Sequence, residues 1–171
     1  GEGGRHRLRQ RRDVLGFEQR GPVRAVLLGD AGEIEARAVL VATGVSYRML
    51  EGPGLQELTG RGVYYGATAS EAVQCQGDEV YVVGAANSAG QATLNLAKHA
   101  SRVVMLVRGG SLEEGMSQYL VDRITEAPNV EVRLHCEVAS ARGEGHLAYI
   151  AIRDRETGAE EEVPTTWLFV F

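Results

Sequence analysis

Residues 79–107 read EVYVVGAANSAGQATLNLAKHASRVVMLV, and this stretch decides the fold. The apolar segment 79–83 is typical of a buried strand, and a turn of small residues follows it. The next residues predict a helix, and 102–107 predicts a second apolar strand. This order is typical of a βαβ unit that binds a dinucleotide, with the helix N-terminus facing the pyrophosphate. The stretch therefore predicts a Rossmann-like α/β domain.

The small-residue turn departs from the usual Gly-x-Gly-x-x-Gly/Ala pattern at one position. Gly84 occupies the first position and Ala89 the third. Ala86 occupies the second position, where a β-carbon most directly faces the phosphates, so we expect it to weaken binding. A turn that only packs a helix onto a strand is the alternative. The expected pyrophosphate site is Gly84, Ala85, Ala86, Asn87, Ser88 and Ala89.

The end of the second strand indicates which nicotinamide cofactor binds. NAD sites usually carry an acid there for the ribose 2′-hydroxyl, whereas NADP sites carry an arginine for the 2′-phosphate. Residues 105–110 read MLVRGG, with Arg108 at the tip and no acid. A guanidinium can hold a phosphate in a bidentate manner, which favours NADP (NADPH). Ser111 is either a second phosphate donor or a helix cap, and an ordinary surface role for Arg108 is the alternative.

Beyond this unit, the sequence predicts a continued alternation of strands and helices. Ser111 and Glu114 form a capping-box pair, which is one way to start the next helix before the break at Pro128. An alternating segment at 130–134 predicts a strand, and two further strands flank the turn at 156–158. We expect a three-layer α/β fold in which a Rossmann-like dinucleotide-binding domain carries a β-meander.

The N-terminal third of the chain reads as three zones. Residues 1–13 are rich in Gly and Arg, which favours a flexible basic terminus over a nucleic-acid arm. Residues 14–50 predict short strands with a turn at 29–32, ending in the apolar strand 38–42. Residues 51–62 hold four Gly and one Pro and predict a connector.

Composition and charge narrow the class of protein. The 171 residues carry a net charge of −5, which gives no general attraction for nucleic acid. Cys75 and Cys136 lie far apart and form neither a metal-ligand pattern nor a disulfide framework. The absence of a metal-ligand pattern predicts a protein without a metal. The sequence also lacks a membrane-spanning apolar run and a secretory leader, so we expect a soluble cytoplasmic protein.

Several motifs together resemble the thioredoxin reductase-like FAD/NAD(P)-dependent oxidoreductases, the class II pyridine nucleotide-disulfide oxidoreductase family. The resemblance runs from about Val14 to Phe171. The motifs are Ala42-Thr43-Gly44 after an apolar run, Gly60-Arg61-Gly62-Val63 with Tyr64-Tyr65, and Val82-Val83-Gly84 with Asn87-Ser88-Ala89.

The resemblance implies a domain layout for a fragment of a longer flavoprotein. Residues 14–50 would be part of an FAD-binding domain, closed by the FAD-contacting residues Ala42, Thr43 and Gly44. Residues 63–167 would be the inserted NAD(P)H-binding domain, and 168–171 would start the re-entry into the FAD domain. NADPH, FAD and a homodimeric state are implied in the same way.

The sequence departs from the family at the redox dithiol. Thioredoxin-reducing members carry Cys-Ala-Thr-Cys where this chain has Gly66-Ala67-Thr68-Ala69, and neither Gly nor Ala can pass electrons to a disulfide. A small buried side chain is the favoured interpretation of the nearby Cys75.

The resulting hypothesis is an enzyme part that passes hydride from NADPH to flavin without the usual dithiol. No catalytic side chain is predicted, because the two cofactors carry this chemistry and the protein positions them. A flavin reductase acting on ferredoxin or a quinone is one alternative. A non-catalytic nucleotide-binding or interaction domain is another, and the electron acceptor is left open.

Overall fold

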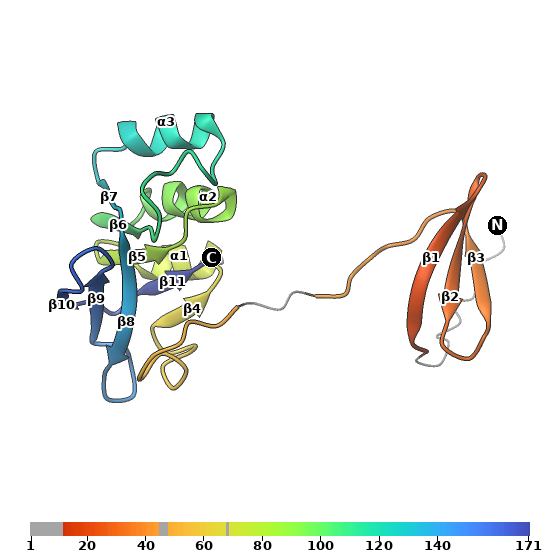
Figure 1. Ribbon diagram of the computed structural model, residues 1–171, viewed down its shortest axis with the longest axis horizontal. Coiled ribbons are helices and arrows are strands. Elements are labelled where there is room, and N and C mark those ends of the chain that lie inside the picture. Colours follow the sequence, from red (N-terminus) through yellow and green to blue (C-terminus); the bar gives the residue numbers. More distant parts are fainter. Residues whose placement is uncertain (1–11, 45–47, 68) are drawn as a thin grey trace. The chain divides into compact units, whose positions relative to one another are not determined.

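The computed structural model describes residues 12–44, 48–67 and 69–171. The chain divides into two units, Gly1–Val45 and Ser46–Phe171 (Figure 1). Each unit is described by itself. Most of the expected basic terminus, residues 1–13, lies outside the described residues.

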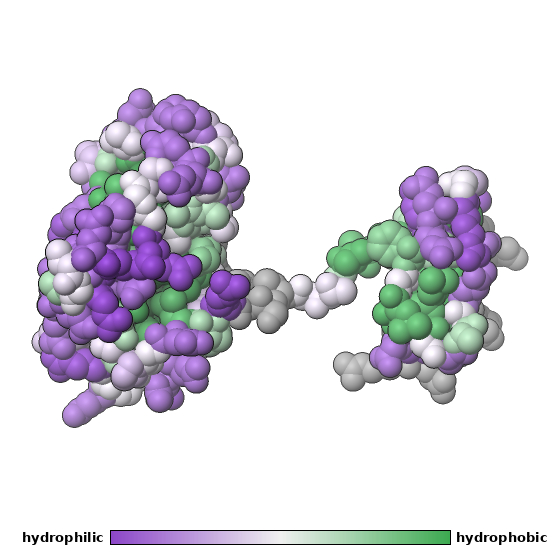
Figure 2. All heavy atoms as spheres, viewed as in Figure 1, coloured by the Kyte–Doolittle hydropathy of each residue, from purple (hydrophilic) through white to green (hydrophobic). Residues whose placement is uncertain are grey.

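Unit 1 is a three-stranded antiparallel sheet in the order β1-β2-β3. Its strands are β1 (Val14–Arg20), β2 (Val23–Leu28) and β3 (Glu33–Ala36). The turn predicted at 29–32 joins β2 to β3, and the Leu28 N–H donates to the Gly32 carbonyl at 2.9 Å. Apolar side chains lie on the surface of this sheet (Figure 2), among them Leu15, which is 74% exposed, and Phe17, which is 60% exposed.

The strand predicted at 38–42 is absent. These residues have no regular secondary structure and are exposed, and Leu40 is 90% exposed. An apolar run becomes a strand only where a neighbouring strand accepts its backbone hydrogen bonds. The described part of unit 1 pairs only β1, β2 and β3.

Unit 2 is built on a five-stranded parallel sheet in the order β4-β11-β5-β6-β7. The strands are Val63–Tyr65 (β4), Leu168–Val170 (β11), Glu79–Val83 (β5), Arg102–Leu106 (β6) and Val130–Arg133 (β7). The central strands are nearly continuous apolar runs because both faces of a parallel sheet are covered. The predicted βαβ unit is therefore present with its two strands side by side.

Helices cover one face of this sheet and a β-meander covers the other (Figure 1). The helices are α1 (Ala69–Gln74), α2 (Asn87–Leu96) and α3 (Gln118–Glu126). The meander is an antiparallel sheet of β8 (Cys136–Arg142), β9 (Tyr149–Asp154) and β10 (Glu160–Pro164). On β5, Val80 and Val82 pack toward the helices, whereas Tyr81 and Val83 pack toward the meander. The predicted three-layer α/β fold with a β-meander is confirmed.

Residues 51–62 were predicted as a connector but pack into unit 2. Leu55 and Leu58 are buried in the core between sheet and meander. A β-carbon on Gly54 would stand 1.8 Å from the Ala141 carbonyl oxygen, so glycine permits a close backbone approach here. The Gly content therefore reflects tight packing rather than a linker.

The expected boundary at 167/168 does not match the sheet. β11 pairs in parallel with both β4 and β5, so it completes the same sheet that carries the βαβ unit. Its residues Leu168, Phe169 and Val170 are buried. Residues 168–170 are thus an internal part of unit 2.

The helix expected from Ser111 begins later than predicted. Residues 111–117 form turns, and α3 starts at Gln118 with Ser117 as its N-cap. The Ser117 side chain makes no capping hydrogen bond. Its N–H instead donates to Oδ1 of Asn87 at 2.8 Å, so α2 supplies the partner for the start of α3.

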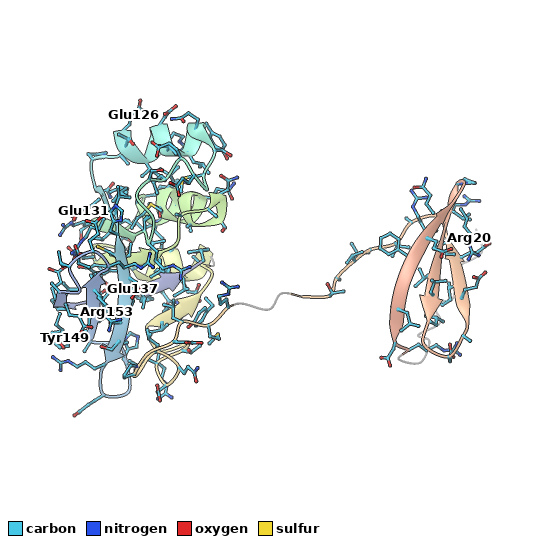
Figure 3. All side chains as sticks on the ribbon, viewed as in Figure 1. Arg20, Glu126, Glu131, Glu137, Tyr149 and Arg153 are labelled. Carbon is cyan, nitrogen blue, oxygen red and sulfur yellow. The ribbon has the colours of Figure 1, made fainter. Side chains whose placement is uncertain are left out.

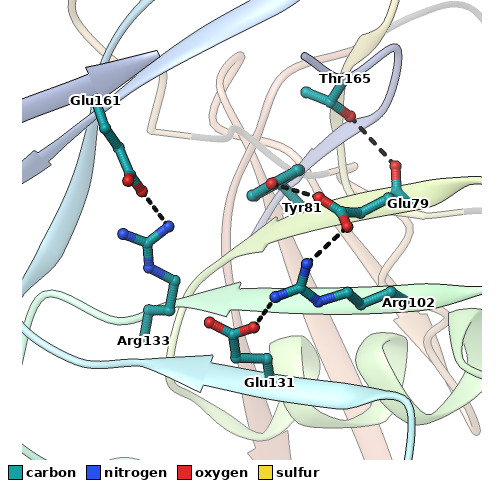
Figure 4. A network of polar contacts seen from close by, with 7 residues as sticks. All are labelled: Glu79, Tyr81, Arg102, Glu131, Arg133, Glu161 and Thr165. Carbon is teal, nitrogen blue, oxygen red and sulfur yellow. Dashed lines mark hydrogen bonds and ion pairs between the residues drawn. The ribbon is translucent and has the colours of Figure 1, made fainter. Parts of the chain in front are cut away.

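A charged network crosses the sheet at the amino ends of the strands (Figure 4). Arg102 on β6 pairs with Glu79 on β5 at 2.9 Å and with Glu131 on β7. The Tyr81 hydroxyl donates to Glu79 at 2.5 Å, and burial together with this carboxylate raises the pKa of Tyr81. Because Arg102 is half exposed, we expect these pairs to fix strand register more than to add stability.

Candidate functional site

A cleft of about 730 Å³ lies at the carboxyl ends of the parallel strands in unit 2. Ligands of open α/β sheets bind at this edge, where neighbouring connections leave the sheet in opposite directions. In unit 2 that point lies between β5 and β11. From β5 the chain continues to β6 and β7 on one side of the sheet, whereas β11 and β4 lie on the other side. Of the predicted site residues, the cleft is lined by Gly84, Ala85, Ala86, Arg108 and Ser111.

The first position of the turn requires glycine for two reasons. Gly84 has φ of 139°, a conformation that other residues rarely adopt. A β-carbon there would stand 3.0 Å from the Ala89 β-carbon and 3.1 Å from the Phe171 carbonyl oxygen. Ala89 is fully buried, so α2 lies close against β5. Gly84 and Ala89 thus have the packing roles of the first and third positions in a dinucleotide turn.

Ala86 is the N-cap of α2 and lines the cleft with its exposed methyl group. Its backbone is extended, at φ −92° and ψ 174°, so nothing in the conformation excludes other residues. The first bond of the helical ladder runs from the Gly90 N–H to the Ala86 carbonyl at 3.1 Å. The N–H groups of residues 87–89 precede that ladder and form a helix N-terminus of the kind that binds anions.

Asn87 and Ser88 are exposed and do not line the cleft. The Asn87 amide oxygen already accepts the Ser117 N–H, which ties the start of α2 to the start of α3. A site role for them stays a prediction.

Arg108 follows β6 and is exposed at the edge of the cleft, with half-buried Ser111 nearby. Its carbonyl accepts a hydrogen bond from Nη1 of Arg155 at 2.9 Å. The next carbonyl, of Gly109, accepts the His135 N–H at 3.1 Å. The meander and the segment before it thus hold the tip of β6. Sequence reasoning missed the role of Arg155, since only the fold brings it to Arg108.

The meander side of the cleft carries charged side chains that pair with one another. Figure 3 labels two of them, Glu137 and Arg153. Arg153 on β9 pairs with Glu160 at 2.7 Å and with Glu137 at 3.4 Å. Both Arg153 and Glu137 line the cleft. The paired carboxylates raise the pKa of Arg153 and balance its positive charge at this side of the cleft.

At the other end of the cleft, the segment before β4 brings both charged and apolar residues to the lining, namely Arg48, Met49, Leu50 and Glu51. At the tips of β4, β11 and β5 the lining is apolar or aromatic, with Tyr65, Phe171 and Val83. The Leu50 N–H donates to the Tyr65 hydroxyl at 3.0 Å, which holds this segment against β4. An uncharged aromatic ring would fit the surface at these strand tips.

The predicted FAD contacts belong to the other unit. Ala42, Thr43 and Gly44 lie in unit 1 and are exposed. Their role in FAD binding stays a prediction.

The two cysteines are free and buried. The Cys75 thiol donates to the Ala72 carbonyl at 3.2 Å, and burial raises the pKa of Cys75. Burial likewise raises the pKa of Cys136. A thiol must ionise to act in redox exchange, so neither cysteine has the environment of a reactive centre. Within the described ranges, no group of three or more His, Cys, Asp or Glu residues could hold a metal.

A family model described as "Pyridine nucleotide-disulphide oxidoreductase" matches residues 5–171. The chain belongs to this family. A thioredoxin reductase of Peptoclostridium litorale is 33% identical over 85% of this chain and 47% of its own length. The structure resembles thioredoxin reductase from Streptococcus pyogenes MGAS5005, with a TM-score of 0.71 and 26% identity over 94% of this chain and 51% of that one.

Thioredoxin reductase from Giardia duodenalis shares the fold, with a TM-score of 0.77 and 23% identity over 94% of this chain and 52% of that one. The chain spans about half the length of these relatives. The family model and the 33% identical relative confirm the predicted family. None of the described helices is long and apolar enough to cross a membrane.

Proposed function

We propose that unit 2 is the NAD(P)H-binding part of an FAD-dependent oxidoreductase that passes hydride from NADPH to flavin. The cleft at the carboxyl edge of the parallel sheet carries this proposal, because it combines a helix N-terminus, a glycine-dependent turn and Arg108. Family membership supports it independently. FAD and a homodimeric state follow from the same family resemblance.

Different residues of the cleft would bind different parts of NADPH. The backbone N–H groups of residues 87–89 would bind the pyrophosphate, since the hydrogen bonds of α2 begin only at the Gly90 N–H. Gly84 would shape the turn below it, because its own N–H donates to the Leu106 carbonyl at 3.2 Å. Arg108 and Ser111 would bind the 2′-phosphate. The apolar lining at Tyr65 and Phe171 would hold the nicotinamide ring and exclude water from it. When bound, NADPH supplies the hydride.

Disulfide reduction through the family's usual dithiol is not part of this proposal. Gly66 stands at the first of those positions with φ of 88°, and its N–H donates to the Val170 carbonyl at 2.8 Å. Thr68 lies outside the described residues. Since buried Cys75 is poorly suited to replace the dithiol, we expect an acceptor other than a disulfide, such as ferredoxin or a quinone.

A calorimetric titration of the 171-residue chain with NADPH tests the proposal. Arg108→Ala should weaken NADPH binding by about tenfold or more, the effect of losing a charge-assisted hydrogen bond. Arg123→Ala is the matched control, because Arg123 is exposed on α3 and does not line the cleft. Calorimetry is preferred to tryptophan quenching, since Trp167 stands at the start of β11, away from the cleft.

Folding of the chain is checked by circular dichroism before the titration. A folded chain that binds neither NADPH nor NADH would contradict the proposal. That result would favour the non-catalytic domain, for which Ala86 in the phosphate turn is the supporting observation.

A further inference from the structure

The segment between β6 and α3 brings a carboxylate to the Arg108 end of the cleft. Glu114 lines the cleft together with Arg108 and Ser111. Its Oε2 atom lies 3.7 Å from the point where a β-carbon on Gly109 would stand. Because Gly109 directly follows Arg108, this carboxylate is at the tip of β6 although it comes from a later part of the chain.

The backbone on both sides of Glu114 is fixed. The N–H groups of Gly115 and Met116 donate to the Leu112 carbonyl at 3.2 and 3.0 Å. Leu112 and Met116 are buried. A β-carbon on Gly115 would stand 3.0 Å from the Ala85 carbonyl oxygen, so the segment packs directly on the phosphate turn. Glu114 is thus held between that turn and the tip of β6.

A carboxylate and a guanidinium at the same place favour different nucleotides. A carboxylate accepts hydrogen bonds from the ribose hydroxyls of NADH and repels the 2′-phosphate of NADPH. Arg108 attracts that phosphate. The strand tip itself lacks the acid typical of NAD sites, but the fold supplies one from the loop.

We propose, on the basis of the proposed function above, that Glu114 is a specificity-determining residue of the nucleotide cleft. It takes the place of the missing strand-tip acid, and it lets the cleft accept NADH alongside NADPH. The affinities of the unaltered chain for the two nucleotides then differ by less than about tenfold, since opposed charges act on the 2′ position.

Paired calorimetric titrations with NADPH and NADH, which differ only by the 2′-phosphate, test this inference. Glu114→Gln keeps the size of the side chain and removes its charge. We expect NADH binding to weaken by about tenfold and NADPH binding to tighten by about threefold. The NADPH effect should shrink at high salt, because exposed charges are screened.

Glu113→Gln is the matched control, since Glu113 is the neighbouring exposed acid and does not line the cleft. The inference is overturned if the two variants change the NADPH-to-NADH affinity ratio equally, or if Glu114→Gln weakens both nucleotides alike. In either case the proposed function stands. A folded chain that binds neither nucleotide overturns the proposed function itself and this inference with it.

Discussion

The two ends of the proposed nucleotide cleft in unit 2 are held in different ways. At the tip of β5, the turn is shaped by contact: Gly84 lies against Ala89 and Phe171 with no room for a side chain. At the tip of β6, exposed Arg108 is supported by a hydrogen bond from Arg155. Under the proposed function, this difference teaches that packing sets the shape any dinucleotide needs, whereas exposed charges set which dinucleotide is preferred.

The largest effect should come from adding a methyl group at the packed end, at the tip of β5. Gly84→Ala should lower the free energy of unfolding by about 3 kcal/mol, because it combines backbone strain with overpacking. NADPH binding should be lost with it. Urea denaturation measures the first effect and calorimetry the second.

Gly77→Ala separates strain from packing in this test. Gly77 has φ of 82° but nothing within 4 Å of its β-carbon position, so only strain of about 1 kcal/mol is expected. Equal destabilisation of the two variants would show that contact with Ala89 and Phe171 does not shape the turn.

The charged end should respond to a substitution outside the cleft itself. Arg155→Ala removes the hydrogen bond to the Arg108 carbonyl and the ion pair with Glu137 at 3.4 Å. NADPH binding should weaken by about threefold, with little change in stability. Arg142→Ala is the control, because Arg142 pairs with Glu162 elsewhere on the meander. If both variants bind NADPH as the unaltered chain does, the meander does not support the tip of β6.

The smallest effect should come from restoring the usual turn sequence. Ala86→Gly removes the exposed methyl group that lines the cleft, and NADPH should bind about threefold more tightly. Stability should hold, since Gly is at least as good an N-cap as Ala. Ala85→Gly, at the neighbouring lining position, should give no gain. Tighter binding in both variants would point to turn flexibility rather than to the Ala86 methyl group.

The sequence predicted the features that arise locally. The strand, turn and helix from Glu79 onward depend on neighbouring residues, so apolar periodicity and Gly84 were enough to find them. The start of α3 was misjudged because its first N–H is bound by Asn87, which is distant in sequence. The burial of Leu55 and Leu58 was not predicted, because they lie in a glycine-rich segment and their packing partners lie on the meander.

The site was predictable only where it follows a strand end. Arg108 was found because it follows β6 directly. The fold brings Arg155 to the same place from the hairpin after β9, and Glu114 from the packed segment between β6 and α3. The separation of either residue from Arg108 in the sequence does not predict this. The family resemblance identified the fold, but only the tertiary structure showed that Arg155 and Glu114 lie beside Arg108.

The place of β11 in the sheet has a consequence for folding. This strand lies between β4 and β5, with Leu168 opposite both Val63 and Tyr81, yet it is far from both of them in the sequence. Such distant pairings slow folding, because a long loop must close before the contacts form. During synthesis the facing edges of β4 and β5 stay unpaired until residue 170 has left the ribosome. Nucleotide binding should therefore appear only after β11 has inserted between β4 and β5.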